Sequence, residues 1–253
     1  MALTYSQTLT KLDGTTVNLS DYSSNTLLVV NMASHSGWTA GQLASLQALH
    51  TAHSASGLKI MVFPTGNYAT STYTDGEEYA TNAEIKSNLD SNYTIGFDVF
   101  QKIDVLSTTN TWNEGTQTVD KVAHGRTQDS FWQEVVALSG ISPDWSYMKY
   151  LIAPGGAQVT FFGSSDVLPN QYSYTAGYNW VDAPYNAIDH TVATMADIEG
   201  ASPSVNQKVK ITNSDGAGNW KIINYNGSGN YTTLGTSDGT SKWDDALATY
   251  LAM

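Results

Sequence analysis

The chain has 253 residues, of which 41% are hydrophobic and only 13% are charged. Its net charge of −12 disfavours nucleic-acid backbones and anionic membranes, so we expect neither partner. It contains no cysteine, which excludes disulfides, thiolate metal sites and catalysis by a protein thiol. We also expect no metal or other cofactor. Residues 1–7 lack a basic stretch followed by an apolar one, so we expect no secretory signal peptide.

The first third of the chain alternates strand patterns with a helical one. Two short strands at 8–12 and 16–19 flank an Asp-Gly turn signal, which predicts a hairpin. An apolar run at 27–32 predicts a buried strand. Thr39 can cap a helix with leucines at helical spacing, and a second apolar run follows at 58–64. A strand, a helix and a strand in this order predict a parallel pair.

The middle of the chain continues the same pattern. Residues 81–84 fit a helix capping box, and residues 97–105 are typical of extended chain. An Asp or Ser can cap a helix over 131–138. Strands at 148–152 and 158–162 flank a Pro-Gly-Gly turn, which predicts a second hairpin. The whole order predicts an α/β fold with a mixed sheet flanked by helices.

The texture changes after residue 169. Short strand patterns separated by Gly, Asn and Asp predict a β-meander within 205–236, and 241–251 fits a capped helix. We therefore expect a core over 1–169, a β-rich insertion over 170–240 and a closing helix of the core over 241–253. The alternative is a separate domain over 170–253.

Aromatic residues crowd this added segment. Tyr and Trp bury large areas while keeping a polar tip, so they are favoured at protein interfaces. The alternative is that they cover the core domain. The candidate interface residues are Tyr172, Tyr174, Tyr178, Trp180, Tyr185, Trp220, Tyr225 and Tyr231.

Five segments in order carry a resemblance to a known family. They are 12–22, 31–39, 63–68, 97–105 and 145–152. Residues 31–39 read Asn-Met-Ala-Ser-His-Ser-Gly-Trp-Thr, which resembles the active-site loop of the glutathione peroxidases, Asn-x-Ala-Ser-x-Cys(or Sec)-Gly-x-Thr. The resemblance implies a thioredoxin-like fold.

The family's catalytic set is Cys or Sec, Gln, Trp and Asn. Those positions fall on Ser36, Asn67, Trp145 and Ser146, so only the tryptophan is kept. A serine hydroxyl is protonated near neutral pH and cannot cycle through a sulfenic acid. His35 is adjacent to Ser36, but neighbours in a loop usually point apart. We therefore interpret the four positions as degenerate.

These observations favour a non-catalytic structural protein of a larger assembly. The low charge and the Ser/Thr/Asn/Gly texture resemble bacteriophage virion proteins such as decoration, neck or tail components. On this hypothesis the partners are other protein subunits, in a homo-oligomer or a virion, and the chain is located in the virion or in the host cytoplasm before assembly. Two alternatives stay open. One is a module that binds a ligand or carbohydrate in the former cleft, and the other is a redox or hydrolytic enzyme with a relocated site.

Overall fold

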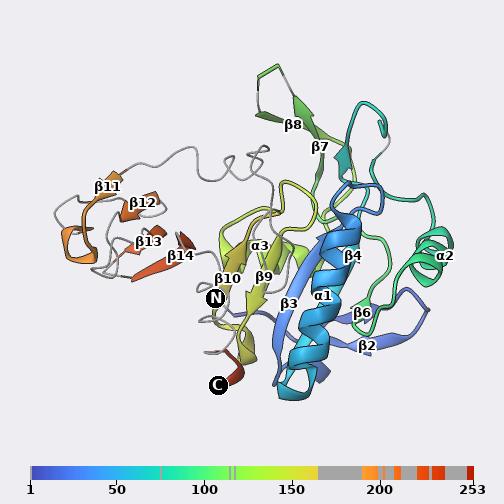
Figure 1. Ribbon diagram of the computed structural model, residues 1–253, viewed down its shortest axis with the longest axis horizontal. Coiled ribbons are helices and arrows are strands. Elements are labelled where there is room, and N and C mark those ends of the chain that lie inside the picture. Colours follow the sequence, from blue (N-terminus) through green and yellow to red (C-terminus); the bar gives the residue numbers. More distant parts are fainter. Residues whose placement is uncertain are drawn as a thin grey trace.

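The computed structural model describes residues 2–74, 76–113, 115–116, 118–164, 190–198, 202, 208–211, 221–227, 230–236 and 250–253. A five-stranded sheet forms its centre (Figure 1). The strands, in spatial order, are β10 (Val159–Phe162), β9 (Lys149–Ile152), β3 (Thr26–Met32), β4 (Leu58–Pro64) and β6 (Asp98–Val99). No helix in these ranges is long and apolar enough to cross a membrane.

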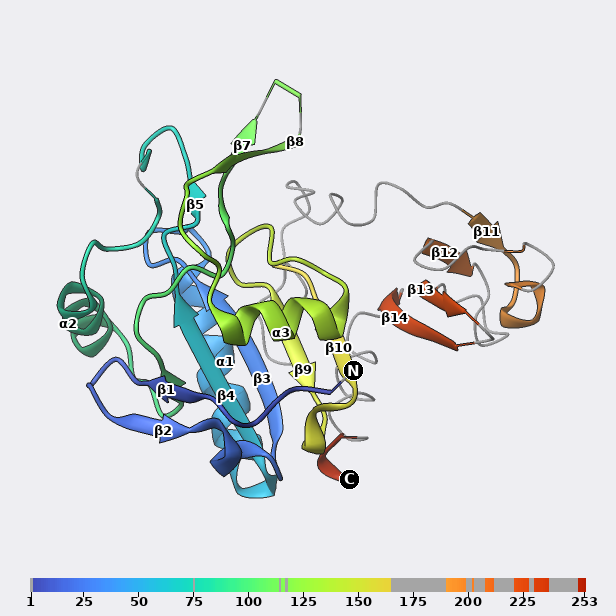
Figure 2. The same ribbon diagram turned by 180° about the vertical axis from the view of Figure 1, so that it is seen from behind.

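Helices cover both faces of the central sheet. α1 (Thr39–His53) lies in front of it in Figure 1, and α3 (Ser130–Ser139) lies in front of it in the reverse view of Figure 2. α2 (Asn82–Asn92) lies beside the sheet. Successive β3 residues point to opposite faces, so Leu28 joins the core cluster under α1, and Val29 joins the cluster under α3. Because β3 is buried on both faces, its sequence is a continuous apolar run.

The sheet topology confirms the thioredoxin-like α/β fold. β3 and β4 are parallel and are joined by α1, as the sequence predicts. β9 pairs with β3 and β10 pairs with β9, both antiparallel, and these strands form the expected second hairpin. The first hairpin, β1 (Thr8–Thr10) and β2 (Thr16–Asn18), is also confirmed.

Several helix caps follow from the sequence and one does not. The Thr81 hydroxyl accepts the Glu84 amide while the Glu84 carboxylate accepts the Thr81 amide, so the capping box is present. Asp129 caps α3 through the Phe131 amide. Thr39 is the first helical residue rather than the cap, because its hydroxyl donates to the Ala33 carbonyl instead.

A second sheet that the sequence analysis does not predict projects beyond the core. It contains β5 (Tyr68–Ala69), β7 (Thr108–Asn113) and β8 (Thr118–Ala123). β7 and β8 carry mainly polar residues, so they lack the apolar alternation that marks a half-buried strand. In the predicted extended stretch 97–105, only the two residues of β6 are in a strand. The short 3-10 helices are η1 (Leu19–Tyr22), η2 (Ser54–Ser56), η3 (Pro154–Gly156) and η4 (Met195–Asp197).

The predicted β-meander is present in the later part of the chain. β12 (Lys208–Ile211), β13 (Lys221–Gly227) and β14 (Asn230–Thr236) are antiparallel neighbours, and β11 (His190–Val192) adds a parallel strand. The candidate interface residues from 172 to 220 lie outside the described residues. Tyr225 and Tyr231 pair across β13 and β14. Their contribution to an interface, like the boundaries of the insertion, stays a prediction.

The chain end returns to the core. The predicted closing helix over 241–249 lies outside the described residues, but Tyr250 and Leu251 are helical. Tyr250 is buried in the cluster under α1, and its hydroxyl lies 3.1 Å from the Thr160 hydroxyl of β10. This contact places residue 250 on the core, while the closing helix over 241–253 stays a prediction.

Candidate functional site

The loop that joins β3 to α1, residues 33–38, lies at the carboxyl end of the two central parallel strands. β3 ends at Met32, beside the end of β4. The Thr39 hydroxyl and the Ser36 amide both donate to the Ala33 carbonyl, at 2.9 and 3.1 Å. The loop is therefore closed on itself at the edge of a sheet where α/β proteins commonly bind ligands.

The Ser36 side chain occupies the position where the resemblance predicts a sulfur or selenium atom. It is only 8% exposed. Its oxygen accepts hydrogen bonds from the Ser146 hydroxyl and the Trp38 amide, both at 3.4 Å. These bonds are long, so the oxygen is only loosely held. In the described part of the chain, no hydrogen bond has the Ser36 hydroxyl as its donor, so its proton can point to a bound molecule.

The loop that carries Trp145 and Ser146 is fixed to β3 by a buried amide. The Asn31 side chain donates to the Tyr68 hydroxyl at 2.6 Å and to the Trp145 carbonyl at 2.7 Å. The Tyr68 hydroxyl in turn donates to the Pro143 carbonyl at 2.6 Å, and its ring packs against Trp145. The two sequence-predicted positions Ser36 and Ser146 are thereby brought together.

A buried lysine supports the same loop from behind. Tyr147 has a φ of +60°, an uncommon conformation for a non-glycine residue. The Lys149 ammonium, fully buried, donates to the Tyr147 carbonyl at 2.8 Å and to the carbonyls of Gly163 and Ser164 at 3.3 and 3.4 Å. Lys149 therefore joins the loop behind Ser146 to the chain that follows β10.

Asn67 does not join this site, although the resemblance places it there. It is fully buried, and its oxygen accepts the Thr65 hydroxyl at 2.6 Å and two backbone amides. Its nitrogen lies 3.1 Å from the Asp104 carboxylate and 2.9 Å from His124 Nε2. Because these hydrogen bonds occupy its oxygen and nitrogen, Asn67 holds residues 65, 104–106 and 124 together and does not line a cleft at Ser36.

The same network holds a carboxylate in its charged form. Burial raises the pKa of Asp104, but hydrogen bonds and charge from Arg126, the Asn67 amide and His124 outweigh this effect and lower it. Arg126 binds Asp104 with two nitrogens at 2.8 and 2.9 Å. Arg126 lies just beyond β8, so this ion pair ties the second sheet to the core.

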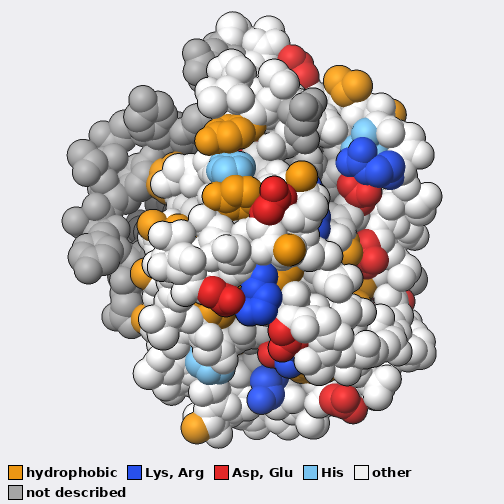
Figure 3. All heavy atoms as spheres, turned by 90° about the vertical axis from the view of Figure 1, so that its right-hand side faces the viewer, with side chains coloured by type: hydrophobic (Ala, Val, Ile, Leu, Met, Phe, Trp, Pro, Cys, Tyr) orange, Lys and Arg blue, Asp and Glu red, His pale blue; other side chains and the backbone are white. Residues whose placement is uncertain are grey.

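His35 points away from Ser36, as the sequence predicts. Its ring stacks on Tyr73, with centroids 4.5 Å apart, and contacts Tyr79 at 4.3 Å. Figure 3 shows this face, where a histidine lies between hydrophobic side chains. No hydrogen bond joins His35 to Ser36 among the described residues, so a serine–histidine dyad is not formed.

Two buried glutamates lie under the loop, although the sequence predicts that they belong to a solvated loop. Glu77 and Glu78 are 7% and 6% exposed, and the Glu77 carbonyl accepts the His35 amide at 2.9 Å. The Glu78 carboxylate accepts the Ser34 amide at 3.1 Å, and burial raises its pKa to about 7. No pattern in the sequence marked them, because their burial comes from contacts with a loop about 40 residues earlier.

This pKa shift predicts a pH dependence of stability. The folded chain holds the Glu78 proton more tightly than the unfolded chain, whose carboxyl has an ordinary pKa of 4.5. The free energy of unfolding should therefore fall by about 3 kcal/mol as the pH rises from 4.5 to 7. Glu77 and Asp129 are shifted in the same direction, so Glu78→Gln should flatten the slope without abolishing it.

Urea unfolding at several pH values measures this slope. Asp90→Asn serves as the control, because Asp90 is exposed on α2 and should leave the slope unchanged. An unchanged slope in Glu78→Gln would contradict the assignment.

No group of three or more His, Cys, Asp or Glu side chains that could hold a metal ion occurs in the ranges that the structure covers.

The chain is similar to known proteins of one family. A family model described as glutathione peroxidase matches residues 4–112. Glutathione peroxidase of Lactococcus lactis is 31% identical over 62% of this chain and 87% of its own length. "Probable glutathione peroxidase 8-B" of Xenopus laevis is 30% identical over 62% of this chain, which spans 64% of that relative. The solved structure of T. cruzi GPX1 is 18% identical, with a TM-score of 0.42, over 66% of this chain and 88% of its own.

These relatives overturn the functional hypothesis drawn from the sequence. They are named as peroxidases, which are enzymes, and none is named as a structural or virion protein. The expectation of a non-catalytic phage component is therefore wrong, and a redox enzyme agrees better with the relatives. The missing cysteine and the polar Ser/Thr/Asn/Gly composition favoured a structural protein, but the fold and the loop sequence are those of the peroxidase relatives.

Proposed function

Since this chain belongs to the glutathione peroxidase family, we propose that it is a redox enzyme that reduces hydroperoxides with a thiol supplied by a second molecule. The chain spans 64% of the Xenopus laevis relative and 87% of the Lactococcus lactis relative. The proposed activity is therefore argued from the residues of the site. One observation carries the proposal. A nearly buried hydroxyl, Ser36, occupies the reactive position of the loop in a chain that has no cysteine.

The absence of cysteine decides where the electrons come from. Reduction of a hydroperoxide needs a soft nucleophile that is ionised near neutral pH, and a serine hydroxyl is neither. The Ser36 hydroxyl can nevertheless bind the peroxide, because it has a proton to donate. Its oxygen accepts the weak hydrogen bonds from the Ser146 hydroxyl and the Trp38 amide, so its proton stays free to turn to the peroxide. The electrons must then come from a thiol that is not part of the chain.

The reaction balances with two external thiols. The sulfur of the first thiolate attacks the distal oxygen of the hydroperoxide, and the oxygen–oxygen bond breaks. The proximal oxygen leaves with the bonding electrons, takes a proton from water and becomes an alcohol. The second thiol attacks the sulfenic acid that has formed, which gives a disulfide and water. The site accelerates the first step by holding the peroxide and stabilising its leaving oxygen.

Thiol-dependent loss of tert-butyl hydroperoxide, with dithiothreitol as the thiol and a chelator present, tests the proposal. The chain should consume hydroperoxide faster than the same buffer without protein, and only when thiol is present. Ser36→Ala removes the donor to the leaving oxygen and should lower the rate by about 10- to 100-fold.

Ser56→Ala is the matched control, because Ser56 is exposed in η2 and the whole of α1 separates it from the loop. It should leave the rate unchanged. Rates equal to the protein-free buffer, or equal rates for the native chain and Ser36→Ala, would refute the proposal.

A further inference from the structure

A cavity lies on the core, and it shares no residue with the Ser36 loop. It has a volume of about 250 Å³ and lies between the β1–β2 hairpin, α2 and β6. Three separate parts of the chain therefore shape it. The Leu12 amide donates to the Val99 carbonyl at 2.8 Å, which fixes the hairpin against β6. Small-molecule sites usually occupy ~300–1,000 Å³, so this cavity is smaller than most and suits only a small ligand.

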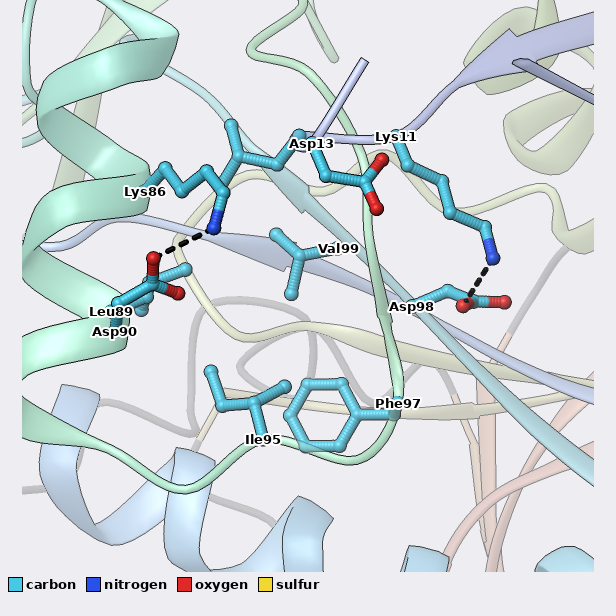
Figure 4. Close-up of a pocket in the computed structure, with 10 residues that line it drawn as sticks. Lys11, Asp13, Lys86, Leu89, Asp90, Ile95, Phe97, Asp98 and Val99 are labelled. Carbon is cyan, nitrogen blue, oxygen red and sulfur yellow. Dashed lines mark hydrogen bonds and ion pairs between the residues drawn. The ribbon is translucent and has the colours of Figure 1, made fainter. Parts of the chain in front are cut away.

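One part of the cavity is lined by apolar side chains. Leu12, Leu89, Ile95, Phe97 and Val99 line it, and Leu89 and Phe97 are almost fully buried. Figure 4 shows Ile95 and Phe97 at one end and Val99 in the middle. An aliphatic group that contacts these side chains would lose part of its contact with water, which favours binding.

The rim of the cavity is charged, with both signs close together. Lys11, Asp13 and Lys86 lie at the end opposite Phe97, with Asp13 between the two lysines (Figure 4). Both ammonium groups lower the pKa of Asp13, after the larger effect of hydrogen bonds from Thr15. With Asp90 and Asp98, three carboxylates and two ammonium groups therefore line one small region.

These charges differ in how firmly they are already engaged. Lys11 binds Asp98 at 2.7 Å, and the Tyr22 hydroxyl donates to the same carboxylate at 2.8 Å, so this pair is part of the fold. Lys86 binds Asp90 at 2.7 Å, but these side chains are 44% and 63% exposed. Exposed pairs contribute only ~0–1 kcal/mol, so a ligand can replace Asp90 at low cost.

The Asp13 carboxylate can also bind a ligand. One of its oxygens accepts the Thr15 amide at 2.8 Å, and it forms no ion pair among the described residues. A ligand that complements this rim therefore carries a cation for Asp13 and an anion for Lys86, separated by a short distance. It also carries an apolar group that reaches Ile95 and Val99.

We propose that this cavity binds a free α-amino acid with an aliphatic side chain. Its ammonium group binds Asp13, its carboxylate binds Lys86 in place of Asp90, and its side chain lies on Leu89, Ile95 and Val99. A purely apolar ligand would gain nothing from the rim charges, which stay exposed to water. An anion alone would lie against Asp13, and a cation alone would leave Lys86 unused.

Titrations followed by backbone amide NMR shifts test this inference, with L-leucine as the probe. Isopentylamine lacks the carboxylate, and 4-methylpentanoate lacks the ammonium group. Leucine should shift the amides of Leu12, Thr15 and Ile95 in a saturable way, and each single-charge analogue should bind at least about tenfold more weakly.

Variants separate binding from folding. Asp13→Asn keeps a residue suited to the Asp-Gly turn, and Lys86→Met keeps α2, so both should fold and bind leucine at least about tenfold more weakly. Asp90→Asn removes the competitor for Lys86 and should bind about threefold more tightly. No saturable shift up to about 10 mM leucine, equal binding of the three compounds, or unchanged affinity in Asp13→Asn and Lys86→Met would overturn the proposal.

Discussion

Replacing Lys149 with methionine is expected to lower the free energy of unfolding by about 3 kcal/mol, a large fraction of the stability of a typical domain. Methionine fills a similar volume, so packing changes little. The loss comes from the buried Tyr147 and Gly163 carbonyls, which no longer receive the ammonium protons. The Ser164 carbonyl, by contrast, keeps its hydrogen bond from the Gln42 side-chain amide. Each carbonyl left without a donor costs about 1–3 kcal/mol, and some will recover a partial partner through relaxation.

Replacing a buried ion by an apolar residue can be neutral where both partners are removed together. Here the backbone carbonyls remain, so a loss is expected. Urea unfolding measures it, with Lys59→Met as the control. Lys59 is a half-buried residue of β4 and should change the stability by less than about 0.5 kcal/mol. An unchanged midpoint for Lys149→Met would show that the ammonium is not needed to hold the Tyr147 loop.

The central part of the fold could be predicted from the sequence because its elements carry strong local signals. β3 and β4 are continuous apolar runs, and the capping box of α2 lies within four residues. The position of Ser36 followed from the same signals, since a loop between a buried strand and a helix must lie at the edge of the sheet. Such local patterns can be recognised without knowing which distant residues are in contact.

Other features of the site depend on contacts between distant residues. Asn67 looks available in the sequence, but Asp104 and His124, 37 and 57 residues later, use its amide. Glu78 looks like a solvated loop residue, but the Ser34 amide 44 residues earlier binds its carboxylate. Long-range hydrogen bonds leave no periodic trace, which is why these two residues were misjudged.

Ser36→Cys is expected to convert the chain into a peroxidase that uses its own thiol. The new sulfur would lie at the start of α1, where the Trp38 amide and the Ser146 hydroxyl donate to position 36. Both interactions favour the thiolate. An attached nucleophile replaces one that must diffuse in, so thiol-dependent turnover should rise on the order of 100-fold over the native chain. Peroxide alone should add one oxygen to the variant, a gain of about 16 Da by mass spectrometry, because a sulfenic acid forms.

Ser56→Cys places a thiol on the exposed surface of η2 and is the matched control. Its thiol should react with peroxide at the slow rate of an ordinary cysteine. Turnover of Ser36→Cys should nevertheless stay below that of the Lactococcus lactis relative assayed alongside, because the Asn67 amide is engaged with Asp104 and position 146 carries a hydroxyl. Turnover equal to the relative would show that neither position limits the reaction. A variant that peroxide oxidises no faster than Ser56→Cys would show that the loop no longer activates a sulfur.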